Sequence, residues 1–157
     1  MSNSRPETLF YKKSNFVAHL PVSHRYTAAH SWAAPTPGGT WRVGLTKFAT
    51  RMLGELVDHG FEPASEAPVE VGQIIGWVEG FKAISDLYCI VRGQFVGGNP
   101  LLRDHLELLG REPFGSGWLY EVRGEPDSGC MDVHAYVQLL DKTIDRILEK
   151  QSGDPSV

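Results

Sequence analysis

The sequence predicts a mainly β protein with short helices. Short segments rich in apolar and β-branched residues are separated by clusters of glycine and proline, which is typical of small sheets joined by turns. Helical periodicity is limited to a few short stretches and one longer stretch near the C-terminal end. The length of 157 residues indicates one domain, which can bury roughly 68–70% of its unfolded surface without a metal or a disulfide.

The N-terminal part is predicted to contain one pair of strands. Residues 1–21 show no clear period, although they include apolar residues that should pack against the rest of the chain. Residues 26–33 are expected to form a strand, residues 35–39 a loop, and residues 41–45 the returning strand.

The middle of the chain is predicted to contain a helix, a loop and a segment whose structure the local residues leave open. Thr46 is a suitable N-cap for a short amphipathic helix that ends at Leu56. Residues 62–69 are rich in proline, glutamate and alanine and are expected to form an exposed loop. Residues 71–96, which include Lys82, allow either a pair of strands or a helix, because an Asn-Gly turn signal is absent.

The C-terminal part is predicted to form two helices with one strand between them. Asn99 followed by Pro100 marks the start of a helix that should stop at Gly110. Residues 118–122 return to a strand, and Asp132 can cap the final helix. The apolar stripe of that helix is formed by Val133, Tyr136, Val137, Leu140, Ile144 and Ile147.

The composition disfavours several classes of function. A net charge of −4 argues against nucleic acid and anionic membranes as partners, and no apolar run approaches the roughly 20 residues of a membrane span. The N-terminal residues lack the apolar core of a signal peptide and the chain has two cysteines, so a cytoplasmic location is expected. The six histidines lack zinc-site spacing, and phosphate loops and nucleophile elbows are absent, so neither a metal site nor a catalytic residue is predicted.

Lys82 is the most informative residue of the sequence. It is the one lysine in a mostly apolar segment, and because an unpaired ammonium group is costly to bury, it should lie at an exposed tip. The segment E-G-F-K-A-I-S-D-L-Y around it resembles E-S-V-K-A-A-S-D-L-Y, the lipoylation site of the H protein of the glycine cleavage system and of related lipoate-binding proteins. A biotin site is a poorer match, because Phe81 and Ala83 replace the methionines that usually flank a biotinylated lysine.

Further blocks in the same order extend this resemblance from about Tyr26 to the end of the chain. Glu79 and Gly93 also occupy the positions, three before and eleven after the lysine, where lipoylating enzymes favour glutamate and glycine. The matching blocks, each given with the usual family pattern in parentheses, are residues 26–32 (Y-T-x-x-H-E-W), 43–46 (V-G-I-T), 53–55 (L-G-D), 99–102 (N-x-x-L) and 112–119 (D-P-Y-G-E-G-W-L).

The resemblance implies a lipoyl-domain-type flattened β-barrel, also called a barrel-sandwich hybrid, with short helices and a C-terminal helix. Residues 22–150 would form this domain, after an N-terminal extension of residues 1–21 and before a flexible tail of residues 151–157. It also implies that lipoic acid is attached covalently to Lys82 as lipoyl-lysine, by a lipoate ligase or other lipoyl-attachment enzymes. Such a protein is a swinging-arm carrier and a substrate of partner enzymes, not an enzyme itself.

Two lipoyl pathways fit the resemblance. Ser31, Phe81 and Cys89 depart from the usual H-protein pattern, and they favour the lipoate-binding proteins of cytoplasmic sulfur oxidation, in which the arm carries a sulfur species to a heterodisulfide-reductase-like complex. The alternative is a glycine cleavage H protein that carries an aminomethyl group between glycine decarboxylase, aminomethyltransferase and lipoamide dehydrogenase. An unmodified H-like interaction scaffold is a third alternative.

Cys89 and His30 are the other residues with a predicted relation to the arm. Strand alternation places Cys89 on the same face as Leu87 and Val91, which indicates a buried packing residue. The alternative hypothesis is a mixed disulfide between Cys89 and the arm. The resemblance places His30 near the arm, where it should line the groove that the arm occupies.

Overall fold

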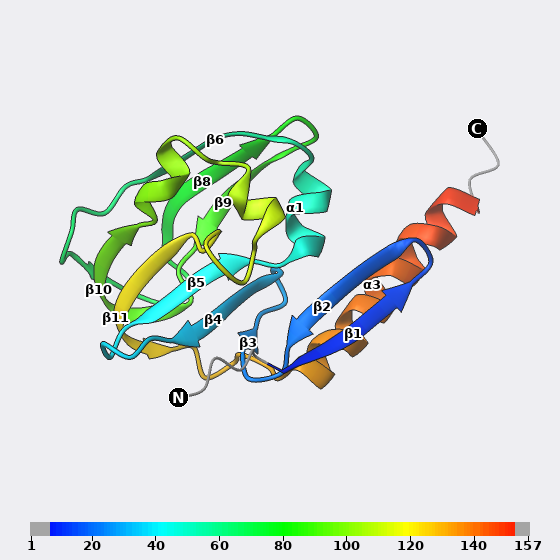
Figure 1. The fold of residues 1–157 in the computed structure, drawn as a ribbon, viewed down its shortest axis with the longest axis horizontal. Coiled ribbons are helices and arrows are strands. Elements are labelled where there is room, and N and C mark those ends of the chain that lie inside the picture. Colours follow the sequence, from blue (N-terminus) through cyan, green and yellow to red (C-terminus); the bar gives the residue numbers. More distant parts are fainter. Residues whose placement is uncertain (1–6, 153–157) are drawn as a thin grey trace.

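The computed structural model describes residues 7–152 and confirms a mainly β fold with a C-terminal helix (Figure 1). Two sheets, of six and three strands, form a flattened barrel. The larger sheet has the order β3–β4–β5–β11–β10–β7, with β3 at Arg25–Tyr26, β4 at Ser31–Pro35, β5 at Trp41–Leu45, β11 at Tyr120–Pro126, β10 at Val91–Gly98 and β7 at Pro68–Val69. The smaller sheet has the order β6–β8–β9, with β6 at Leu56–Phe61, β8 at Ile74–Gly80 and β9 at Ile84–Tyr88.

Apolar side chains from both sheets fill the interior of the barrel. Val78 of β8, Leu87 of β9 and Val122 of β11 are all buried in one cluster. Their strand neighbours point outward, because successive side chains of a strand lie on opposite faces of a sheet. The two sheets therefore hold each other in place through a shared apolar core, and the hairpin of β8 and β9 stands on a rigid base.

The first strand pair differs from the prediction that residues 26–33 form a single strand. β3 ends at Tyr26 and β4 begins at Ser31, with a tight turn between them. The backbone N–H of His30 donates to the carbonyl of Thr27 (3.0 Å), and His30 adopts the left-handed region with φ +67°. No glycine or proline marks this turn, which is why the sequence pattern missed it. The returning strand β5 is confirmed at its predicted residues.

Helix α1 (Lys47–Leu53) starts where predicted but ends before Leu56. Gly54 terminates it with φ +81°, a conformation that glycine adopts without the penalty of a Cβ. Residues 62–69 are mostly exposed, as expected, but the last two form β7, which pairs with β10 and buries Val69. A strand of this length leaves no period for a sequence pattern to detect.

The predicted single helix between Asn99 and Gly110 is wrong. The chain forms a 3-10 helix η1 (Pro100–Arg103) and a separate turn of helix α2 (Leu108–Arg111), and Gly110 lies within α2. The Asn99 side-chain oxygen caps η1 by accepting from a backbone N–H (3.1 Å), as predicted. Its side-chain amide donates to two carbonyls of the loop before β11 (2.8 Å each), so Asn99 ties η1 to that loop. β11 starts later than the predicted strand at residues 118–122 and continues further.

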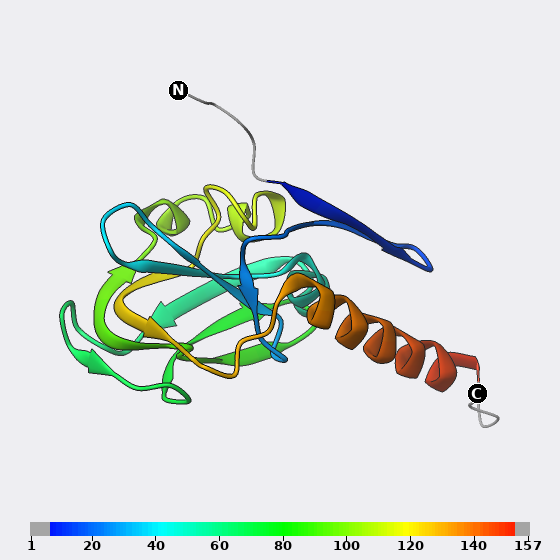
Figure 2. The same cartoon turned by 90° about the horizontal axis from the view of Figure 1, so that it is seen from below.

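A hairpin of β1 (Thr8–Lys13) and β2 (Phe16–Pro21) packs against helix α3 (Val133–Ser152) and forms a second apolar core beside the barrel. Figures 1 and 2 show the hairpin and α3 projecting together from one end of the barrel. The expectation that residues 1–21 pack against the rest of the chain is therefore confirmed for residues 7–21. The buried residues of this core are Tyr11, Phe16, Ala18, Leu20, Tyr26, Trp32, Phe48, Val133, Tyr136, Leu140 and Ile144.

Helix α3 begins as predicted. The Asp132 carboxylate accepts a hydrogen bond from a backbone N–H of the first turn (2.9 Å), and the predicted apolar stripe packs in the second core. Residues 151–152 belong to α3, whereas the sequence placed them in a flexible tail of residues 151–157. Residues 153–157 lie outside the described residues, as do residues 1–6 of the expected N-terminal extension. Within residues 7–152, no helix is long and apolar enough to cross a membrane.

Two partly buried histidines predict a loss of stability in acid. Burial lowers the pKa of both His24 and His30 to about 4, whereas histidines of an unfolded chain titrate near about 6.5. Because the unfolded chain binds these protons first, the two histidines leave stability unchanged above about pH 6.5. They lower the free energy of unfolding progressively as the pH falls from about 6.5 toward about 4.

The variant His24→Phe tests this prediction. The imidazole packs against the rings of Trp32 and Phe114, with distances between ring centroids of 4.9 Å and 5.7 Å. Its Nδ1 has no hydrogen-bond partner within residues 7–152. A phenylalanine ring can therefore fill the same space. We expect the variant to lose less free energy of unfolding than the unchanged protein between about pH 6.5 and about pH 4, as measured by urea denaturation. Equal losses in both proteins would contradict the assignment to His24.

Candidate cofactor-attachment site

Lys82 lies at the tip of the hairpin formed by β8 and β9. The last cross-strand pair is Glu79 with Ile84, and the N–H of Gly80 donates to the carbonyl of Ala83 (2.8 Å) to close the turn. The predicted pair of strands is therefore confirmed, and the helical alternative for this segment is excluded. Lys82 is exposed, as predicted for an unpaired ammonium group.

The end of α1 and the start of β6 brace this turn. The N–H of Lys82 donates to the carbonyl of Leu53 (2.9 Å), and the N–H of Phe81 donates to the carbonyl of Glu55 (2.9 Å). Gly54 lies directly against the lysine stem, where a Cβ would come within 2.9 Å of Lys82 Cγ. Two elements of the fold thus fix the backbone of the lysine, while its side chain leads into solvent.

The surroundings of the lysine are exposed and acidic. Phe81 has 74% of its surface exposed, and the carboxylates of Glu79 and Asp86 are exposed as well. No ion pair within residues 7–152 involves Lys82. An acylating enzyme can therefore reach the amine from solvent without first breaking a salt bridge.

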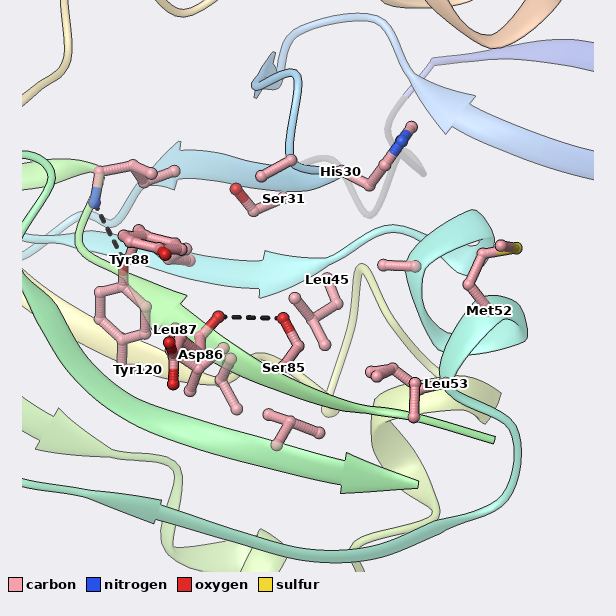
Figure 3. A pocket seen from close by; sticks show the side chains of 17 residues that line it. His30, Ser31, Leu45, Met52, Leu53, Ser85, Asp86, Leu87, Tyr88 and Tyr120 are labelled. Carbon is pink, nitrogen blue, oxygen red and sulfur yellow. Dashed lines mark hydrogen bonds between the residues drawn. The ribbon is translucent and has the colours of Figure 1, made fainter. Parts of the chain in front are cut away.

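An apolar cavity of about 350 Å³ opens beside the hairpin (Figure 3). Residues of β9 form one wall, residues of α1 a second, and residues of β5 a third. Ala83, the residue that follows Lys82 in the turn, is one of the lining residues. The lining residues are Ala29, His30, Ser31, Val43, Leu45, Ala49, Met52, Leu53, Val78, Ala83, Ser85, Asp86, Leu87, Tyr88, Ile90, Leu119 and Tyr120.

Few polar groups reach this cavity. Asp86 supplies the single carboxylate among the lining residues, all of which belong to the described part of the chain. His30 lines the cavity, as predicted, but Figure 3 shows its side chain directed away from Ser85 and Asp86. Its Nδ1 lies 2.9 Å from the hydroxyl of Tyr136 in α3. The imidazole therefore belongs to the second core, and Asp86 remains the charged group at the cavity.

Cys89 is not placed to react with an arm on Lys82. Cys89 is 1% exposed, its thiol donates to the carbonyl of Val91 (3.0 Å), and it is absent from the cavity lining. Burial raises the pKa of the Cys89 thiol and also that of Cys130, which reduces the thiolate fraction. These observations support the packing interpretation of Cys89 over the mixed-disulfide hypothesis.

Within residues 7–152, no group of three or more histidine, cysteine, aspartate or glutamate side chains is arranged to hold a metal ion. The histidines expected at the surface or in the core include His24 and His30, both of which pack against aromatic rings of the second core. Their imidazoles are therefore used in packing.

Sequence reasoning missed the contact between Gly54 and Lys82. The L-G-E block of residues 53–55 matched the family pattern, but a match does not reveal what the block touches. Gly93 also has a structural reason to be glycine, and its expected role as an aid to the lipoylating enzyme stays a prediction. It lies inside β10, where a Cβ would overlap the carbonyl oxygen of Arg123 in β11, so the sheet itself requires glycine there.

Comparisons with known proteins agree with this geometry. The family model described as glycine cleavage H-protein matches residues 24–143. A glycine cleavage system H protein of Corynebacterium jeikeium is 38% identical over 120 residues, which cover 74% of this chain and 94% of that protein. The protein of the same name from Kocuria rhizophila is 35% identical over 129 residues, which cover 80% of this chain and all of that protein.

A solved structure extends the match to three dimensions. The crystal structure of a glycine cleavage system H protein from Mycobacterium marinum superimposes with a TM-score of 0.68 and 34% identity, covering 76% of this chain and 97% of the other. These relatives all bear the glycine cleavage name, so the comparisons do not support the expected sulfur-oxidation subgroup or its heterodisulfide-reductase-like partner. The chain belongs to the glycine cleavage H-protein family, whose members are not enzymes but carry a covalently attached lipoyl group as substrates of partner enzymes.

Proposed function

We propose that this chain is lipoylated on Lys82 and carries the aminomethyl group derived from glycine. The observation that carries the proposal is the position of Lys82 at an exposed, braced hairpin tip beside an apolar cavity. Membership of the glycine cleavage H-protein family supports it. The partners would be a lipoate ligase or other lipoyl-attachment enzymes, then glycine decarboxylase, aminomethyltransferase and lipoamide dehydrogenase.

The residues around Lys82 fit a lipoyl group. An alkyl chain that ends in a dithiolane ring is apolar, and the cavity of about 350 Å³ offers it mostly apolar side chains. When attached, the group would supply a disulfide that can be opened, so that one sulfur holds the carbon that glycine retains after losing CO2 and the other sulfur holds a proton. The chain's own residues anchor the arm at a fixed point, and the cavity can keep water from its loaded end.

Asp86 favours an aminomethyl cargo over a sulfur cargo. Asp86 is among the residues that line this mostly apolar cavity, and its exposed carboxylate gives a protonated amine carried nearby a favourable charge interaction. A terminal persulfide is anionic when deprotonated and would be repelled by the same carboxylate. The sulfur-carrying alternative and the unmodified scaffold therefore have less support than the aminomethyl carrier.

Loading by glycine decarboxylase tests the proposal directly. Lipoylated protein is incubated with the decarboxylase and glycine, and the intact mass of the carrier is followed with time. We expect one lipoyl group per chain before the reaction and one aminomethyl adduct after it. A chain isolated from its native cell without a lipoyl group would instead support the scaffold alternative, and a lipoylated chain that glycine decarboxylase does not load would contradict the aminomethyl assignment.

Gly54→Ala is expected to slow lipoylation. The new Cβ would lie 2.9 Å from Lys82 Cγ and 3.2 Å from the Lys82 backbone nitrogen, so the lysine stem must move. The positive φ of Gly54 adds a cost of about 1–3 kcal/mol in stability. We expect the rate of modification by a lipoate ligase to fall about tenfold, because small displacements of a reacting group reduce rates strongly.

Gly72→Ala is the matched control. Gly72 has a similar φ of +89°, but a Cβ there would meet nothing within 4 Å. The control should therefore lose comparable stability in urea denaturation while its rate of lipoylation stays at that of the unchanged protein. Equal rates in the Gly54 and Gly72 variants would show that the contact with α1 does not position the lysine.

A further inference from the structure

The outward face of the β6–β8–β9 sheet carries exposed apolar and acidic side chains beside Lys82. Asp58, Glu79 and Ile84 lie directly opposite one another across the three strands, so their side chains share one face. The neighbouring row, which contains the buried Val78, also contains His59 and faces the other way. The outward face borders Lys82, and Asp58, Glu79 and Ile84 are all exposed on it.

Large apolar side chains are concentrated on this face and at its tip. Phe81 is 74% exposed, Ile84 is 66% exposed and Tyr88 is 52% exposed. Ile84 lies on the outward face of β9, Phe81 precedes Lys82 in the turn, and Tyr88, at the other end of β9, also lines the cavity. Single exposed apolar residues are normal, but several together beside an attachment point indicate an interaction surface.

The charge of this face selects the kind of partner. Strands β6, β8 and β9 with their turn contain three carboxylates, Asp58, Glu79 and Asp86, and among lysine and arginine they contain Lys82 alone. The local formal charge is −2, and it becomes −3 when acylation neutralises the amine. A complementary partner must present lysine and arginine side chains around an apolar recess.

The same charge changes select the step at which the partner binds. The face is more acidic after lipoylation than before it, so it attracts a basic partner more strongly once the arm is attached. Loading an aminomethyl group adds a positive charge when its amine is protonated, which returns the local charge toward −2. Attraction is therefore greatest for the lipoylated but unloaded carrier, with its arm either oxidised, which is the form that a loading enzyme must find, or reduced.

We propose that the outward face of β6–β8–β9, centred on Ile84 and Phe81 and bordered by Asp58, is the docking surface for glycine decarboxylase. This inference rests on the proposed function. The decarboxylase contacts it through basic residues that surround an apolar recess at the entrance to its active site. The surface sets the affinity of the encounter, and Lys82 with its arm delivers the cargo.

Five lipoylated proteins test this docking surface. They are the unchanged chain, Asp58→Lys, Asp58→Asn, Ile84→Ser and a control, Glu149→Lys, and each is confirmed as fully lipoylated by intact mass. Glu149 is exposed near the end of α3, so its replacement alters the total charge as Asp58→Lys does but at a site on the projecting helix (Figure 2). Affinity for glycine decarboxylase is measured by biolayer interferometry at low and high salt, and the KM for loading is measured in parallel.

Asp58→Lys should weaken binding about tenfold and flatten its salt dependence, because it replaces an attraction with a repulsion. Ile84→Ser should weaken binding about fivefold with the salt dependence unchanged, because it removes only apolar contact. Glu149→Lys should bind like the unchanged chain. The kcat for loading should stay the same in all five proteins, since the arm and its lysine are untouched. Asp58→Asn is a second variant at this position in case Asp58→Lys misfolds. Its side-chain oxygen can still accept the hydrogen bond that Asp58 accepts from the His59 N–H. We expect it to weaken binding about threefold.

Wild-type affinity and KM in both Asp58→Lys and Ile84→Ser would overturn the docking surface and leave the proposed function intact. Failure of the unchanged lipoylated chain to bind or to be loaded would overturn both. The two variants could also bind the decarboxylase normally but be lipoylated more slowly or bind lipoamide dehydrogenase more weakly. That result would assign the face to another enzyme and overturn its assignment to glycine decarboxylase.

Discussion

Lys82→Arg is expected to abolish lipoylation completely while leaving the fold intact. A guanidinium group stays protonated and is not a comparable nucleophile, so the acyl transfer that forms the amide cannot occur. The side chain is exposed at the hairpin tip, and its structural contacts are made by the backbone N–H and the stem next to Gly54. Arginine keeps these contacts and the positive charge. We therefore expect a change in the free energy of unfolding within about 0.5 kcal/mol.

The measurement for this variant is intact mass after incubation with a lipoate ligase, combined with urea denaturation. Lys47→Arg is the control, since Lys47 is also exposed and lies in the neighbouring helix α1. The control should accept one lipoyl group at the normal rate. A lipoyl group on the Lys82→Arg variant would place the attachment site at another lysine and would remove the basis of the proposed function.

Gly93→Ala is expected to destabilise the barrel by about 3 kcal/mol or more. Gly93 pairs with Gly124 of β11, and a Cβ on Gly93 would overlap the carbonyl oxygen of Arg123, which is backbone and cannot move without parting the strands. Its φ of +153° adds strain for any residue with a side chain. Overpacking and backbone strain each cost about 1–3 kcal/mol, and here they act together. Thermal or urea denaturation measures the loss.

Gly97→Ala separates the two costs. Gly97 lies in the same strand with a nearly identical φ of +152°, but a Cβ there would have nothing within 4 Å, because the pairing of β10 with β11 shifts beside it. We expect a loss of about 1 kcal/mol, from strain alone. Equal losses at both positions would show that the clash with β11 is relieved at low cost.

The glycine pair also resolves the role assigned to Gly93 by the resemblance. A Gly93→Ala protein that is as stable as the Gly97 variant yet poorly lipoylated would support a direct role of Gly93 in recognition by the lipoylating enzyme. A Gly93→Ala protein that is less stable than the Gly97 variant, without a separate defect in lipoylation, would show that packing in the sheet is the reason for glycine at this position. The close approach to Arg123 predicts the second outcome.

Much of the fold was predictable because local chemistry and tertiary packing agreed. Asp132 and the apolar stripe after it defined α3, since a cap and a 3.6-residue period are both visible along the chain. One error occurred where a contact distant in sequence decided the local structure, since the segment after Asn99 forms two turns tied to the loop before β11. The other error, in residues 26–33, is a local turn closed by His30, which no glycine or proline marks in the sequence.

For the candidate site, the sequence by itself determined the chemistry: one lysine flanked by apolar and acidic residues, with an amine too costly to bury. It also favoured a sulfur cargo from Phe81 and Cys89, which the comparisons do not support. Only the tertiary structure decided how the lysine is held and what lies beside it. Residues from α1, β5 and β9 meet at the cavity, and Gly54 meets Lys82, because the shared core of the two sheets brings separate segments together. Such contacts depend on packing between distant segments, and that packing leaves no period or spacing in the sequence.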